Sequence, residues 1–137
     1  MIYKCAVLLL LILTSSPSEA SSEFPLTVHH PLYTITAEPA EKTVTLNKIH
    51  QWLITINDIN GHPIQGLQFD VKGGMPNHQH GLPTQPRLIG ENEPGKYLID
   101  GMKFNMHGKW QLELINIDSD FPFKYQIEFE LNHANSK

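Results

Sequence analysis

Residues 125–131 read YQIEFEL, and this stretch decides the fold class. Its apolar residues alternate strictly with polar ones: Tyr125, Ile127, Phe129 and Leu131 against Gln126, Glu128 and Glu130. Successive side chains of a β-strand point to opposite faces, so this alternation produces one apolar face and one solvated face. An amphipathic helix would instead repeat its apolar residues every three or four positions. The stretch therefore predicts a half-buried strand of an antiparallel sheet.

The same alternation recurs towards the N-terminus. Segments of this kind begin at Trp52, Leu67, Tyr97 and Trp110, and weaker strands are expected at residues 32–37 and 43–46. Turn-forming residues such as Asn60-Gly61 and Glu93-Pro94-Gly95 separate them. About seven short strands without a helical pattern are typical of a β-sandwich. The sequence predicts an all-β, immunoglobulin-like antiparallel β-sandwich in a single domain.

The N-terminus has the pattern of a secretory signal peptide. One lysine precedes an apolar run over residues 5–13, which is too short to span a bilayer, and a small-residue site ends at Ala20. We expect a signal peptide over residues 1–20, a flexible leader over residues 21–31 and the β-sandwich domain over residues 32–137. The mature chain is expected to be periplasmic or secreted, without membrane insertion.

Composition excludes several classes of function. Cys5 is the only cysteine and leaves with the signal, so the mature chain has neither a disulfide nor a thiolate ligand. The net charge is −4 and Arg87 is the only arginine, which argues against nucleic acid as a partner. The chain has no nucleophile motif, zinc-protease motif or phosphate-binding loop. It is not expected to be an enzyme.

The segment of residues 73–86, GGMPNHQHGLPTQP, carries the candidate chemistry. In an extended chain His78 and His80 point to the same side, so both imidazoles can reach one ion. Met75 precedes them, and Met106 and His107 follow in the stretch GMKFNMHGKW. Thioethers and imidazoles without a thiolate favour copper over zinc. The prolines restrict the backbone of the loop.

Three other interpretations stay open on the residues alone. The two histidines can serve as structural residues that bond backbone carbonyls, with the loop as a protein-docking surface that holds no metal. Met106 shares its parity with Met102 and Phe104, so it can also fill the core. Finally, the two tryptophans can line a pocket between the sheets, in which case the protein is a small-ligand carrier.

The sequence resembles the YtkA-like domain family over residues 46–117. The resemblance rests on M-P-x-H-x-H-G-L-P-T-x-P from Met75 to Pro86, on G-x-x-F-x-M-x-G-x-W from Gly101 to Trp110, and on N-x-x-H-x-W around His50. It is similar in particular to small exported bacterial proteins labelled auxin-binding protein, and more distantly to the FixH proteins of oxidase assembly. The resemblance implies an immunoglobulin-like β-sandwich in the periplasm, connected with copper handling or respiratory metalloenzymes.

Together, the residues and the resemblance predict a copper site. Its ligands are Met75, His78, His80 and Met106, with His50 and His107 in reserve. His50 is either a ligand from a neighbouring strand or a core histidine bonded across the sheet. The protein would act as a copper chaperone or as an assembly factor for a respiratory metalloenzyme. Its partner would be a periplasmic or membrane-bound metalloprotein.

Overall fold

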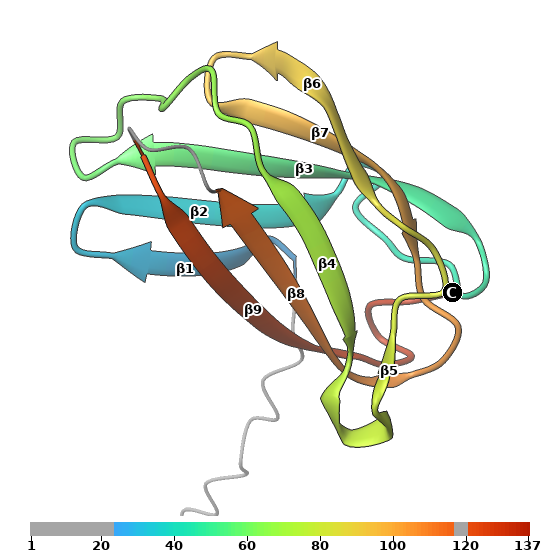
Figure 1. Ribbon diagram of the computed structural model, residues 1–137. Coiled ribbons are helices and arrows are strands. Elements are labelled where there is room, and N and C mark those ends of the chain that lie inside the picture. The colour runs from blue at the N-terminus through green and yellow to red at the C-terminus, as the bar shows by residue number, and fades with distance from the viewer. Residues whose placement is uncertain (1–23, 117–120) are drawn as a thin grey trace, which may run out of the picture.

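Two antiparallel sheets pack face to face in the computed structural model, which describes residues 24–116 and 121–137 (Figure 1). The first sheet holds, in spatial order, β1 (Leu26–His30), β2 (Tyr33–Pro39), β3 (Ile49–Asp58), β7 (Lys96–Lys103) and β6 (Arg87–Glu93). The second holds β5 (His80–Gly81), β4 (Asp70–Met75), β8 (Gly108–Asn116) and β9 (Phe123–Leu131). A single 3₁₀ turn, η1 (Pro76–His78), connects β4 to β5. The all-β prediction is confirmed.

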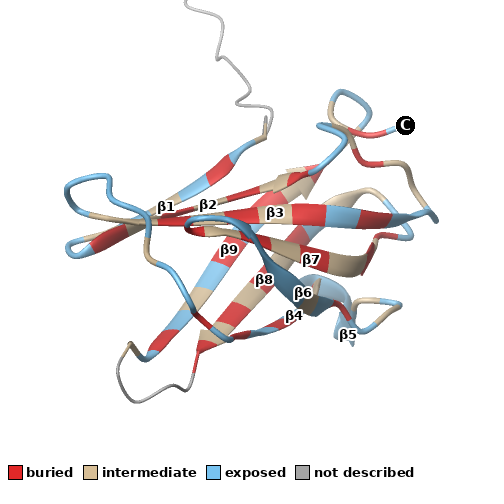
Figure 2. Cartoon of the chain, turned by 90° about the horizontal axis from the view of Figure 1, so that it is seen from above, coloured by how far each residue is buried: buried red, intermediate tan, exposed pale blue. Residues whose placement is uncertain are grey.

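The period-two residues form the core between the sheets. Buried residues alternate with half-buried or exposed ones along β2, β3, β7, β8 and β9, as the colour bands of Figure 2 show. In the second sheet Trp110 lies opposite Phe129. Phe104 packs edge-on against Trp110 and also contacts Trp52 of the first sheet. These rings join the two layers.

One of the two weaker strand predictions, that for residues 43–46, is wrong. Residues 43–46 form no strand; Val44 makes only an isolated parallel bridge with Ser136. The backbone there pairs with the C-terminal tail instead. Lys137 N–H donates to Val44 O at 2.7 Å, and Leu46 N–H donates to Lys137 O at 2.9 Å. A left-handed residue, Asn47 (φ 64°), follows directly.

The first sheet contains two strands that the sequence did not indicate. The segment predicted as a flexible leader, residues 21–31, contains β1, which pairs with β2 from Leu26 to His30. Leu26 is buried and the Phe24 ring lies 5.3 Å from the Trp52 ring between centroids, so residues 24–31 belong to the sandwich. The other strand, β6, pairs with β7 and is mostly exposed, which explains its weak pattern.

The predicted signal peptide, residues 1–20, lies outside the described residues. Within residues 24–116 and 121–137, no helix has the length and apolar character needed to cross a bilayer.

Candidate functional site

The histidine motif occupies a tight hairpin that we call the His loop, residues 75–82. Strand β4 ends at Met75, Pro76 opens the 3₁₀ turn, and Gln79 takes a left-handed conformation (φ 54°) that reverses the chain. Met75 then pairs with His80 across the β4–β5 ladder. Gly74 permits this close pairing, because a Cβ there would lie 2.4 Å from His80 O. The loop is therefore set by backbone contacts.

His78 and His80 lie side by side on the exposed surface of this loop. Their ring centroids are 5.9 Å apart. Nδ1 of His80 lies 3.0 Å from Gly81 O. A carbonyl oxygen only accepts hydrogen bonds, so Nδ1 carries the proton and Nε2 keeps a free lone pair. His80 is thus held in a tautomer that can bind a metal ion through Nε2.

Met106 and His80 meet the same tryptophan. Nε1 of Trp110 donates to Met106 O at 3.1 Å, and the His80 ring lies 6.1 Å from the Trp110 ring. Met106 is 38% exposed, so it does not fill the core. Its backbone carbonyl and the His80 ring therefore lie near the same indole.

Met75 points the other way. Its side chain is only 1% exposed, and its Cε lies 2.8 Å from the position that a Cβ on Gly108 would occupy. Its thioether thus belongs to the core, beneath the His loop and not beside the two imidazoles on the surface.

His50 is buried and bonded to backbone. Its Nε2 lies 2.8 Å from Thr45 O and 3.1 Å from Thr45 N. Of the two interpretations left open, this geometry corresponds to a core histidine, although its partner is the preceding loop and not a neighbouring strand. The ring fixes the chain where it enters β3.

His107 is engaged with the C-terminal tail. Its Nε2 lies 2.9 Å from Ser136 Oγ, and its ring contacts His133 with centroids 4.1 Å apart. Sequence reasoning missed this tail contact, because His133 and Ser136 lie near the chain end, where solvated side chains are the default. Nothing in the local pattern indicates it.

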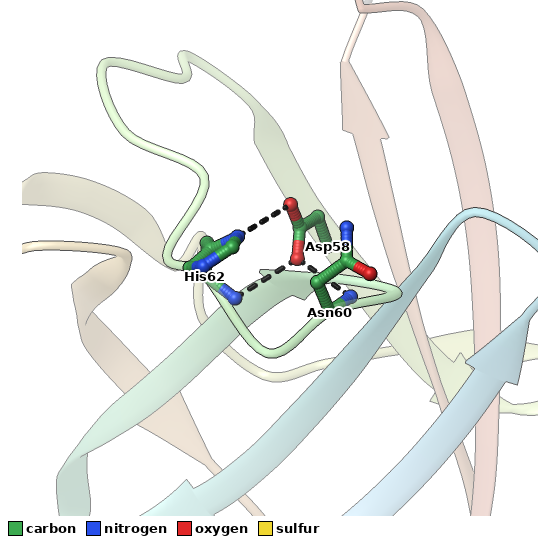
Figure 3. Close-up of polar contacts among 3 residues, drawn as sticks. All are labelled: Asp58, Asn60 and His62. Carbon is green, nitrogen blue, oxygen red and sulfur yellow. Dashed lines mark hydrogen bonds and ion pairs between the residues drawn. The ribbon is translucent and has the colours of Figure 1, made fainter.

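His62 belongs to a turn at the far end of β3 from His50 (Figure 3). The Asp58 carboxylate accepts the backbone N–H groups of Asn60 and His62 at 2.8 and 2.9 Å, and His62 Nδ1 lies 3.3 Å from its second oxygen. The backbone hydrogen bond from His62 is the main reason that the pKa of Asp58 is lowered. These hydrogen bonds stabilise the turn that follows β3.

The two tryptophans are part of the packed core. Trp52 and Trp110 are 0% and 1% exposed, and both contact Phe104. Trp52 Nε1 is buried without a hydrogen-bond partner. Because aromatic rings fill the space between these tryptophans, a ligand pocket between them is not formed.

Comparison with known proteins identifies the family. The sequence model of the YtkA-like domain matches residues 32–114, which is more than half of the chain. The chain belongs to the YtkA-like family. A solved structure, the ZirS C-terminal domain, is 15% identical with a TM-score of 0.43, over 100% of this chain and 87% of that one. No curated protein matches.

Donors available within this YtkA-like domain are few. Over the described residues, no group of three or more His, Cys, Asp or Glu side chains is arranged to hold a metal ion. The His loop itself offers two imidazoles, and no third His, Cys, Asp or Glu side chain of the described residues joins them in such a group.

Proposed function

We propose that this YtkA-like protein is an exported copper-binding protein, with His78 and His80 as the principal ligands and Met106 as the sulfur ligand. The observation that carries the proposal is the pair of exposed imidazoles 5.9 Å apart. Metal–nitrogen bonds are about 2.0–2.1 Å long, so the centroids of two imidazoles on one ion lie roughly 5–6 Å apart. The observed separation falls within that range.

The tautomer of His80 supports the same proposal. Histidine ligands usually donate their second ring N–H to a carbonyl or carboxylate, which fixes the ring and raises its basicity. The Nδ1–H of His80 has such a partner in Gly81 O. Nε2 of His80 is then the nitrogen that binds copper. His78 supplies the second nitrogen from the end of η1.

A mixed set of imidazole and thioether suits transfer of copper to another protein. Two histidines and one methionine bind both oxidation states without the closed shell of four ligands that a structural site uses. Both histidines are exposed, so an incoming ligand from a partner can reach the ion. We propose that this partner is a periplasmic or membrane-bound metalloprotein, and that the protein acts as a copper chaperone or assembly factor.

The His loop is pre-ordered for capture. Pro76 and Pro83 restrict its backbone, and Leu82 N–H donates to Gly73 O at 2.9 Å. A loop that is already fixed loses less conformational entropy when it binds an ion. Affinity therefore depends on the loop geometry as well as on its ligands.

The test is a titration of Cu(I) and Cu(II) into purified protein that begins at Ser21. The variant Trp52→Phe leaves Trp110 as the only tryptophan, and Trp110 lies 6.1 Å from His80, so its fluorescence reports binding. We expect one copper per chain, loss of binding in His78→Ala/His80→Ala, and weaker Cu(I) binding in Met106→Leu. The exposed His29→Ala is the matched control. Stoichiometric copper in the double variant would refute the assignment.

The alternative is a docking loop that holds no metal. It is favoured by the shortage of donors, since no carboxylate joins the two histidines in the described residues. The same titration separates the two functions, because a docking loop binds no stoichiometric copper in the wild type.

A further inference from the structure

A hollow of about 1090 Å³ lies along the open side of the sandwich, and its lining includes neither His78, His80 nor Met106. Its apolar lining includes Phe69, Val71, Leu82, Leu88 and Ile115. Residues from β4 of the second sheet and from the start of β6, an edge strand of the first sheet, line it. Figure 1 shows where these two strands lie. We call this hollow the β4–β6 groove.

The backbone of β4 is unpaired where it borders this groove. Strand β5 pairs only with Gly74 and Met75, so Asp70–Lys72 are paired on one side, with β8. Gly73 O accepts Leu82 N–H on the β5 side. Alternate residues of a strand direct their N–H and C=O groups to the same side, so those of Val71 also face the open edge. Such an edge accepts an added strand.

The wall opposite β4 is fixed before any partner arrives. The hydroxyl of Thr84 donates to Gly101 O at 2.5 Å and ties the segment after the His loop to β7. Pro83 and Pro86 flank this residue, and Pro86 is buried. The groove is therefore an existing surface, and its lining does not need to be ordered on binding.

The charges at the groove are mainly positive, although the chain carries −4. Lys72 and Arg87 both line it and are exposed. Neither forms an ion pair with a described residue, although Lys72 lies opposite Glu113 in the β4–β8 ladder and Arg87 opposite Asp100 in the β6–β7 ladder. Asp70 is the one acidic residue among those that line the groove. Two unpaired cations beside an apolar floor favour a partner that carries carboxylates.

We propose that the β4–β6 groove binds an extended peptide segment of a partner protein, one that alternates apolar residues with at least one aspartate or glutamate. The segment adds to β4 at Val71, places its apolar side chains on the groove floor and directs its carboxylate to Arg87 and Lys72. Binding does not require copper, so the proposal stands apart from the copper site.

A second copy of the chain fits this edge less well. If two β4 strands paired antiparallel about Val71, residue 69 of the second copy would lie beside Gly73. That place is taken by Leu82, whose N–H donates to Gly73 O. A free peptide end avoids the collision because it stops short of Gly73.

The test uses a phage-displayed library of random linear dodecapeptides, selected on the purified protein, followed by synthesis of the enriched sequences. We expect alternating apolar peptides that contain Asp or Glu, and a shift of the Val71 amide in ¹⁵N spectra on binding. The double variant Lys72→Glu/Arg87→Glu should weaken binding about tenfold or more. Lys48→Glu/Lys103→Glu, with the same change in net charge, should leave it within about twofold.

The proposal is overturned if no peptide is enriched, or if the enriched peptides bind the Lys72→Glu/Arg87→Glu variant as well as they bind the wild type. Circular dichroism and thermal melting check that this variant is folded. Concentration-dependent dimers in sedimentation, abolished by the same variant, would assign the groove to a second copy and also overturn it. Peptide binding that persists in His78→Ala/His80→Ala shows that the groove works without the copper ligands.

Discussion

Nε2 of His107 donates a hydrogen bond to Oγ of Ser136 over 2.9 Å, and so joins the β7–β8 loop to the C-terminal tail. The direction follows from Ser136, whose single hydroxyl proton is directed to Asn132 O at 2.5 Å. The serine oxygen must then accept from His107. Because Lys137 in turn pairs with Val44 and Leu46, the tail fastens two loops of the sandwich.

Ser136→Ala should loosen this tail. It removes the acceptor for His107 and the donor for Asn132 O, so we expect a loss of about 1–2 kcal/mol in the free energy of unfolding. Urea denaturation measures the loss, and hydrogen exchange should be faster at residues 44–46. Thr27→Ala, on the exposed face of β1, is the control. An unchanged exchange rate at residues 44–46 would show that the tail is not held by Ser136.

His50→Ala should destabilise the fold and leave copper binding intact. The buried ring is lost and Thr45 loses its partner, which together cost about 2–4 kcal/mol. Chemical denaturation gives the stability, and copper titration below the unfolding transition gives the stoichiometry. If the folded variant has lost its copper, His50 is a ligand and not a core histidine.

Gly74→Ala should weaken copper binding without removing a ligand. The new Cβ would lie 2.4 Å from His80 O and 2.9 Å from Gly81 Cα, so the β4–β5 pair must open and His80 must move. We expect affinity to fall about tenfold or more, because a ligand displaced by even an ångström binds poorly. Gly81→Ala is the control, since its Cβ has only an ordinary contact at 3.4 Å. Equal affinity in the two variants would mean that the His loop need not be rigid.

We expect Asp58 to make the stability of the fold depend on pH in the acid range. Its pKa in the folded protein is lowered, chiefly by the backbone hydrogen bond from His62. A group with a lowered folded pKa stabilises the protein above its unfolded pKa, about 3.9 for aspartate, and this contribution is lost as pH falls through the folded value. Asp58→Ala should therefore lower the melting temperature at pH 7, and the difference should shrink towards pH 3. The exposed Glu41→Ala should show no such trend.

Residue type and spacing were sufficient for the fold class. The alternation of Tyr125, Ile127, Phe129 and Leu131 states which face of β9 is buried, and the structure buries Ile127, Phe129 and Leu131 in the core. The edge strand β6 is mostly exposed on both faces, so neither face needs apolar residues and its sequence does not alternate. Strand β1 was missed because only Leu26 of its five residues is buried.

For the candidate site, the motif located the His loop but did not predict which of its neighbouring side chains are exposed and which are buried. The i, i+2 spacing predicted that His78 and His80 lie together, and their ring centroids are 5.9 Å apart. The extended backbone on which that prediction rested is wrong, because His78 ends the 3₁₀ turn η1 and Gln79 is left-handed. The motif did not separate Met106, which is exposed beside Trp110, from Met75, which is buried against Gly108. Sulfur in a core and sulfur in a ligand set have the same chemistry, and only packing distinguishes them.

The sequence by itself determined that the chain forms strands, which residues face the core, and that two imidazoles share one short loop. These properties are local, because the period of two depends only on the extended backbone of each strand and because residues two positions apart stay within one loop. The tertiary structure alone decided that His50 bonds Thr45, that His107 meets Ser136, and that β4 is left open beside Arg87. The contact of His107 and the open edge of β4 depend on segments distant in the chain, which the order of strands brings together and no local pattern encodes. The His50–Thr45 bond spans a short stretch of chain, but it forms because folding buries the ring.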